Sequence, residues 1–89
     1  MTQVIKNSGV RQRYDARKVY GSVYAACFVA AMAEERCAQL AAHVSSIISK
    51  VLEKKAEIAS SYISRRVTRE LKKLSKEAAF MYSTHRDIG

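Results

Sequence analysis

The sequence predicts a mainly α-helical domain, a four-helix bundle with a small β-hairpin at its N-terminus. Three observations support this fold class. The 89 residues are 48% hydrophobic and 27% charged, a composition typical of a folded domain with one modest core. The chain has no proline and only three glycines, which favours a compact folded domain over a disordered tail. Apolar residues recur at three- and four-residue spacing from about residue 16 onward, whereas the segment before it reads as short strands.

The N-terminal segment is expected to form a hairpin over about residues 3–14. Two β-compatible runs, residues 4–6 and 10–14, flank Asn7-Ser8-Gly9. Gly9 can adopt the left-handed conformation that a tight hairpin turn requires. Strand alternation then places Val10, Gln12 and Tyr14 on one face and two arginines, Arg11 and Arg13, on the other.

Four helices are expected to follow, over about residues 16–31, 34–55, 60–74 and 75–87. Asp15 precedes the first helix, where its carboxylate can accept hydrogen bonds from the unpaired N–H groups of the first turn. Ser60 or Ser61 can cap the third helix in the same way, and Ser75 the fourth. No repeat, low-complexity segment or linker divides the chain, so residues 1–89 are expected to form one domain.

The charge balance indicates a polyanionic ligand or partner. Sixteen Lys and Arg residues against eight Asp and Glu give a formal net charge of +8. Residues 1–20 hold five basic residues and one acidic, and residues 50–76 hold nine and three. The positive potential is therefore concentrated in these two segments, which suits a nucleotide, a nucleic acid or an anionic lipid.

Several classes of protein are not expected. The chain lacks a phosphate loop, a GxGxxG fingerprint and an HExxH motif, so an enzyme is not predicted. Cys27 and Cys37 have no CxxC spacing and read as free structural thiols, without a metal, in a reducing compartment, which we expect to be the cytoplasm. No signal peptide is visible, and the longest uncharged run, residues 19–33, is too short to cross a bilayer, so no membrane role is predicted.

The residues alone leave three functions open. Five cations lie in the hairpin and the first helical turn, where they can bind a triphosphate beside the N-terminus of the first helix: Lys6, Arg11, Arg13, Arg17 and Lys18. The same cations fit a small basic helical protein that binds DNA or another nucleic acid, with Tyr14, Tyr20 or Tyr62 stacking on bases. The third function is that of a subunit that only assembles with other proteins and binds no small ligand.

A family resemblance separates these alternatives. The segment VIKNSGVRQRYDARKVY, residues 4–20, resembles the opening of the ATP-cone domain, whose pattern is V-x-K-R-D/N-G, four residues, then an apolar residue, D/N, x-x-K-I. The resemblance continues through SVYAA at 22–26, IASSYI at 58–63 and EL at 70–71. It closes with AFMYSTHR at 79–86 and so covers the whole chain.

ATP-cones are regulatory modules of ribonucleotide reductases and of the bacterial repressor of reductase genes. The resemblance implies a bundle of four helices capped by the hairpin, with ATP or dATP, and magnesium as an optional companion, bound between them without hydrolysis. It also implies an allosteric nucleotide sensor that acts through self-association or through a protein partner such as a reductase subunit.

The resemblance further implies which residues contact the nucleotide. Val4, Val19 and Ile63 would line the adenine, while Lys6 and Lys18 would hold phosphates. The other implied contacts are Asn7, Gly9, Gln12, Asp15, Ser60, Ser64, Tyr82 and Arg86. The chain departs from the family pattern at Asn7-Ser8, which replaces a basic and acidic pair and removes one cation from the hairpin tip.

Overall fold

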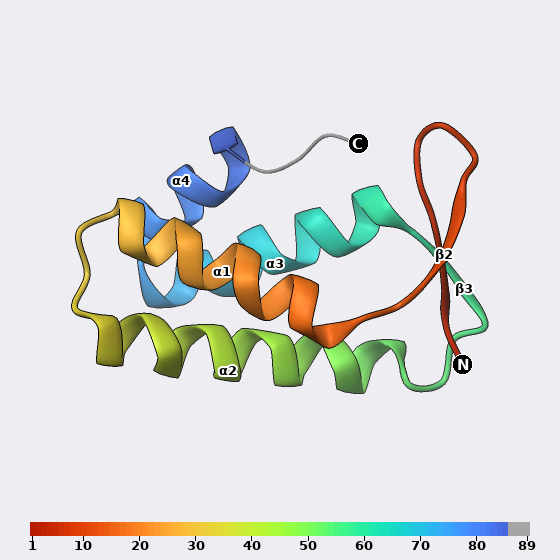
Figure 1. Cartoon of the computed structure of the whole chain (residues 1–89), viewed down its shortest axis with the longest axis horizontal. Helices are drawn as coiled ribbons and strands as arrows, with labels where there is room; N and C mark the ends of the chain where they lie inside the picture. The colour runs from red at the N-terminus through yellow and green to blue at the C-terminus, as the bar shows by residue number, and fades with distance from the viewer. Residues whose placement is uncertain (86–89) are drawn as a thin grey trace.

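Helices dominate the computed structural model, which describes residues 1–85 (Figure 1). Its elements in chain order are β1 (Gln3–Ile5), β2 (Arg11–Arg13), α1 (Ala16–Val29), α2 (Glu34–Leu52), β3 (Glu57–Ala59), α3 (Ser60–Leu74) and α4 (Lys76–His85). The strands lie at one end of the helical bundle. The predicted fold class, mainly α with a small N-terminal sheet, is confirmed.

The sheet has three strands in the order β2-β1-β3, so β1 is central. β2 is antiparallel to β1, with Gln12 opposite Val4. β3 is parallel to β1, with Ile58 beside Val4. The register therefore brings two segments that are far apart in sequence to the same strand residue.

The turn between β1 and β2 has the predicted left-handed glycine. Gly9 has φ 89°, and its N–H donates to the carbonyl of Lys6 at 2.8 Å. The N–H of Lys6 donates in turn to the carbonyl of Val10 at 2.9 Å. These two bonds close the hairpin. A turn this tight requires a residue that tolerates positive φ, which is why glycine occupies position 9.

The third strand was not anticipated, and its pairing shortens the second helix. α2 ends at Leu52 and not near residue 55, because the chain must leave the helix to lie along β1. The buried Thr2 hydroxyl is within hydrogen-bond distance of two carbonyls in this region, 2.6 Å from Leu52 O and 2.7 Å from Lys55 O. The N–H of Gln3 donates to Ala56 O at 2.8 Å. The N-terminus is thus anchored to the end of α2.

Helix caps follow the prediction at two of three places. The Asp15 carboxylate accepts from the N–H of Arg17 at 3.0 Å, and the Ser75 hydroxyl accepts from the N–H of Ala78 at 3.1 Å. The expected serine cap of α3 is wrong: Ser60 is the first helical residue, and the residue before it provides no side-chain cap. The chain enters α3 directly from β3, which fixes the start of the helix without a cap.

The first helix ends two residues before its predicted end. Ala31 has φ 65°, in the left-handed region that is unfavourable for a residue with a Cβ. The N–H of Met32 then donates to Cys27 O at 3.1 Å. This arrangement satisfies a carbonyl of the last turn and directs the chain into α2.

The core lies between the four helices and is built from the predicted apolar stripes. Cys27 and Cys37 are both buried and unbridged. Within residues 1–85 no helix combines the length and the apolar character needed to cross a bilayer. The largest side chains that are almost completely buried are Val23, Val44, Ile48, Leu52, Val67 and Leu71.

Candidate functional site

A cavity of about 160 Å³ lies where the sheet meets the helices. Residues from β1, β2, α1, α3 and α4, together with Tyr14 after β2, contribute to it, so segments from both ends of the chain form one site. Its lining residues are Val4, Gln12, Arg13, Tyr14, Lys18, Val19, Ser22, Ser60, Ile63, Ser64 and Tyr82.

Three aliphatic side chains from three different elements line the cavity. Val4 comes from β1, Val19 from α1 and Ile63 from α3. Val19 is buried, while the other two are half-buried. Because aliphatic groups on several sides exclude water from a flat ring, such a slot suits a heteroaromatic base.

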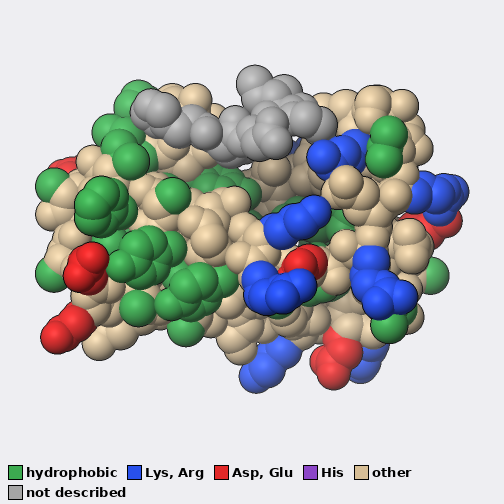
Figure 2. Space-filling view, in the orientation of Figure 1, with side chains coloured by type: hydrophobic (Ala, Val, Ile, Leu, Met, Phe, Trp, Pro, Cys, Tyr) green, Lys and Arg blue, Asp and Glu red, His purple; other side chains and the backbone are tan. Residues whose placement is uncertain are grey.

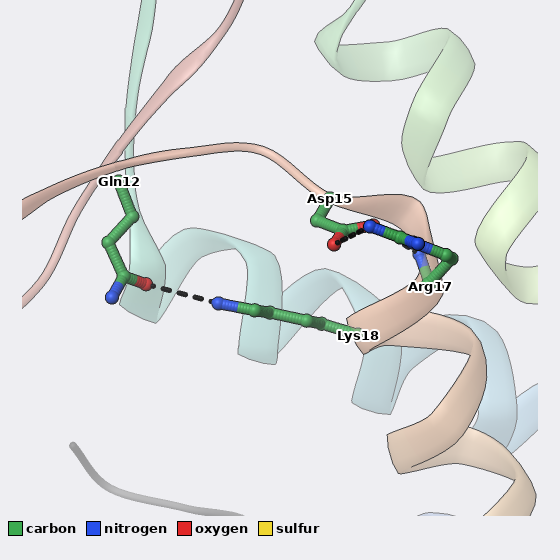
Figure 3. Close-up of polar contacts among 4 residues, drawn as sticks. All are labelled: Gln12, Asp15, Arg17 and Lys18. Carbon is green, nitrogen blue, oxygen red and sulfur yellow. Dashed lines mark hydrogen bonds and ion pairs between the residues drawn. The ribbon is translucent and has the colours of Figure 1, made fainter.

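A polar pair, Gln12 and Lys18, also lines the cavity. The register that sets Gln12 opposite Val4 also makes its amide a cavity-lining group. The Lys18 ammonium donates to Gln12 Oε1 at 3.4 Å, and the two side chains point toward one another between β2 and α1 (Figure 3). A bond of this length on an exposed surface is weak. Lys18 can therefore exchange the amide for a stronger, anionic acceptor.

Asp15 and Arg17 form a separate pair that does not line the cavity (Figure 3). Arg17 donates to the carboxylate through Nε and a terminal nitrogen, both at 3.1 Å, and through its backbone N–H at 3.0 Å. These hydrogen bonds from Arg17 lower the pKa of Asp15 below its usual value. Asp15 is thus a charged cap of α1 that holds Arg17 beside it.

Hydroxyl groups and an uncapped helix end complete the site. Ser60 and Ser64 lie in the first turns of α3 and line the cavity. Because α3 has no side-chain cap, the N–H groups of its first turn keep their capacity to donate to an anion. Ser22 contributes from α1, although its hydroxyl already donates to Lys18 O at 2.8 Å.

The cavity is lined by eight of the thirteen residues that the family resemblance implied as nucleotide contacts. Lys6, Asn7 and Gly9 do not line the cavity, because they belong to the hairpin turn, which extends away from the helices at the end of the sheet (Figure 1). Asp15 does not line the cavity, and its carboxylate accepts hydrogen bonds from Arg17. Arg86 lies outside the described residues. The eight that line the cavity are Val4, Gln12, Lys18, Val19, Ser60, Ile63, Ser64 and Tyr82.

Three lining residues are not among the thirteen contacts that the family resemblance implied, although Arg13 is one of the five cations considered for a triphosphate and Tyr14 was considered for base stacking. Tyr14 shares the strand face predicted for Gln12, so alternation could have identified it; its hydroxyl lies 2.9 Å from Ser49 Oγ. Ser22 is one helical turn after Lys18, so periodicity could have identified it too. Arg13 is the last residue of β2, where the chain leaves the strand and strand alternation no longer applies.

Comparison with known families agrees with this geometry. The ATP cone domain model matches residues 2–88, essentially the whole chain. None of the curated proteins compared with the chain matches it. The ATP cone is a non-catalytic, nucleotide-binding regulatory module whose members generally bind ATP or dATP. This chain belongs to the ATP-cone family.

Proposed function

We propose that the chain is a non-catalytic sensor that binds ATP or dATP in the cavity between the sheet and the helices. The observation that supports this most directly is the combination of an aliphatic slot with a cation beside it, made by Val4, Val19, Ile63 and Lys18. Adenine would lie among the three aliphatic side chains. Gln12 would then turn its amide from Lys18 toward the nucleotide.

The phosphates would extend out of the cavity toward the hairpin. A volume of about 160 Å³ is below the ~300–1,000 Å³ of typical small-molecule sites, so it suits the base and part of the ribose. Lys18 and Arg13 lie at the cavity, and Lys6 lies in the turn with Asn7 and Gly9. These three cations would hold a triphosphate that runs along the hairpin.

The lining chemistry favours binding over hydrolysis. The described lining residues include no Asp, Glu or His, so they supply no ordinary general base for activating water. Residues 1–85 also contain no group of three or more His, Cys, Asp and Glu side chains that could hold a metal ion. Magnesium, where it accompanies the nucleotide, would therefore depend mainly on phosphate oxygens for its ligands.

The nucleotide would act by changing how the domain associates with itself or with a protein partner, such as a reductase subunit or a regulator of reductase genes. Phe28, Val29 and Phe80 are large, exposed hydrophobic residues on α1 and α4. On the face shown in Figure 2, hydrophobic side chains gather at the end opposite the sheet, while the Lys and Arg side chains lie toward the sheet. Two free thiols, Cys27 and Cys37, support a reducing, cytoplasmic location.

A thermal-shift series tests binding. ATP and dATP should both raise the melting temperature, with about 2.7 kcal/mol of added stability at 100 times the dissociation constant. GTP is the control for base selectivity. Absence of a shift with either adenine nucleotide would refute the assigned ligand.

Light scattering after size-exclusion chromatography tests sensing. The molar mass of the domain, alone or mixed with a reductase subunit, should differ between the empty and nucleotide-bound states, because a ligand shifts an assembly only through different affinities for its forms. Tight nucleotide binding with unchanged assembly in both mixtures would refute the sensor while leaving the binding site intact.

A further inference from the structure

A second, strongly basic groove lies between α3 and α4, apart from the cavity described above. Its volume is about 520 Å³. α4 packs back against α3 (Figure 1), and the groove takes its described lining residues from these two helices. The described residues that line the groove are four cations and two hydroxyl side chains: Arg65, Thr68, Arg69, Lys72, Lys73 and Ser83.

Three of these cations have no counter-ion within residues 1–85. Arg65, Arg69 and Lys72 are exposed and take part in no ion pair there. Glu70, the only acidic residue of α3, is buried and pairs with two other cations: its carboxylate accepts from Arg66 at 3.1 Å and Lys73 at 3.3 Å. As far as the described residues go, the groove therefore keeps a positive charge that no acidic side chain balances.

Helix electrostatics explains only part of this charge. Lys72 lies in the last turn of α3, where the negative end of the helix dipole favours a cation. Arg65 and Arg69 lie in the middle of the helix, where the dipole gives no such benefit. Two adjacent arginines on one helix face also repel each other. A bound anion would therefore reduce the electrostatic repulsion between Arg65 and Arg69.

The spacing of the three cations matches a repeating anion. Residues 65, 69 and 72 fall within ~60° of one another around the helix and span about 10 Å along its axis. Phosphates along one strand of a nucleic acid duplex advance by about 3.4 Å each along the duplex axis. A row of about 10 Å spans about three such steps, so its three cations can contact up to three phosphates.

We propose that the α3–α4 groove binds the phosphate backbone of a nucleic acid duplex. None of the described lining residues is aromatic, so the groove offers no platform on which the bases of a single strand could stack. Arg65, Arg69 and Lys72 bind the phosphates. The hydroxyls of Thr68 and Ser83 already donate to Ser64 O at 2.9 Å and Phe80 O at 3.0 Å, so the three cations supply the binding. The interaction does not depend on the base sequence, because phosphate contacts carry no sequence information.

The groove and the nucleotide cavity are distinct surfaces of the same helix pair. Ser64 lines the cavity and Arg65 the groove, and likewise Tyr82 and Ser83 lie on opposite sides. A variant in one site should therefore leave the other site functional. This separation makes the proposal independent of whether the cavity binds ATP.

Fluorescence anisotropy with a labelled DNA duplex of about 20 base pairs tests the proposal at ~50 to 200 mM salt. The double variant Arg65→Gln and Arg69→Gln should weaken duplex binding about tenfold or more at low salt. It should also lower the slope of log K against log salt by about 1.8, since each lost contact removes ~0.9. Arg36→Gln with Lys50→Gln is the matched control, because both residues are exposed on α2 and the net charge falls equally.

Four outcomes would overturn the proposal. The first is equal weakening in the α2 control, which would show a general charge effect. The second is loss of duplex binding in Lys18→Ala, which would place the nucleic acid in the nucleotide cavity. The third is absence of duplex binding by the unmodified chain at low salt. The fourth is tighter binding of a single strand of equal length. Retained melting temperature in the arginine variant shows that it remains folded, because both side chains are exposed.

Discussion

Replacing Lys18 by alanine should separate nucleotide affinity from stability. Lys18 is exposed in the first turn of α1, and within residues 1–85 the only hydrogen bond given for its side chain is the 3.4 Å contact with Gln12. An exposed side chain with one long bond contributes little to folding, so the free energy of unfolding should change by less than about 0.5 kcal/mol. Alanine is also a favourable helix residue.

The loss of affinity should be much larger. A hydrogen bond from an ammonium to a phosphate is charge-assisted and contributes about 1.5–3 kcal/mol. Each 1.4 kcal/mol corresponds to a tenfold change, so the dissociation constant for ATP should rise by about 10- to 140-fold. Adenosine has no phosphate, so its affinity should stay nearly unchanged.

Isothermal titration with ATP and adenosine, together with urea unfolding, measures these quantities. Arg17→Ala is the matched control: it is adjacent, removes the same charge, and its side chain is 92% exposed. Arg17 contacts Asp15 and does not line the cavity. An exposed ion pair contributes at most about 1 kcal/mol to stability, so the Arg17→Ala variant should stay folded. Because Arg17 does not line the cavity, the variant should also retain ATP affinity.

The assigned role of Lys18 is wrong if its alanine variant binds ATP within twofold of the unmodified chain. It is equally wrong if Arg17→Ala loses as much affinity, since a general loss of positive charge would then explain both results. A large drop in unfolding free energy for Lys18→Ala would show that the side chain serves the fold.

Three further predictions concern the fold. Thr2→Val should lower the unfolding free energy by about 1–3 kcal/mol, because it removes the buried donor to Leu52 O; urea unfolding measures this. Burial raises the pKa of the Cys27 thiol to about 11, so the unfolded chain loses this proton first as the pH rises, and stability should fall between pH 9 and 11; unfolding measured against pH, with Cys27→Ala for comparison, tests it. Ala31→Gly should raise the melting temperature, because it relieves the positive φ of 65°.

Each of these has a clear contrary result. Unchanged stability in Thr2→Val would mean that the carbonyl it contacts is satisfied by another donor. An identical pH slope with and without Cys27 would assign the alkaline loss to other groups. A lower melting temperature for Ala31→Gly would show that the added freedom of the unfolded chain outweighs the relief.

The family resemblance predicted the parts of the site that lie on regular elements. Local signals predicted only the elements that carry these residues: the hairpin that carries Val4 and Gln12, and the helix after the Asp15 cap that carries Lys18 and Val19. Their presence around one cavity agrees with the family resemblance. The turn residues Lys6, Asn7 and Gly9 do not line this cavity, so their contact with a nucleotide stays a prediction.

The sequence by itself determined the helices, the hairpin and the concentration of charge, because periodicity, capping and turn chemistry act between near neighbours. Only the tertiary structure decided that Glu57–Ala59 pairs with β1 and that the basic face of α3 meets α4 in a groove. Three residues of strand carry almost no local signal, and their pairing depends on contacts more than fifty positions away. Such contacts form only when the whole bundle is packed, so no reading of adjacent residues could anticipate them.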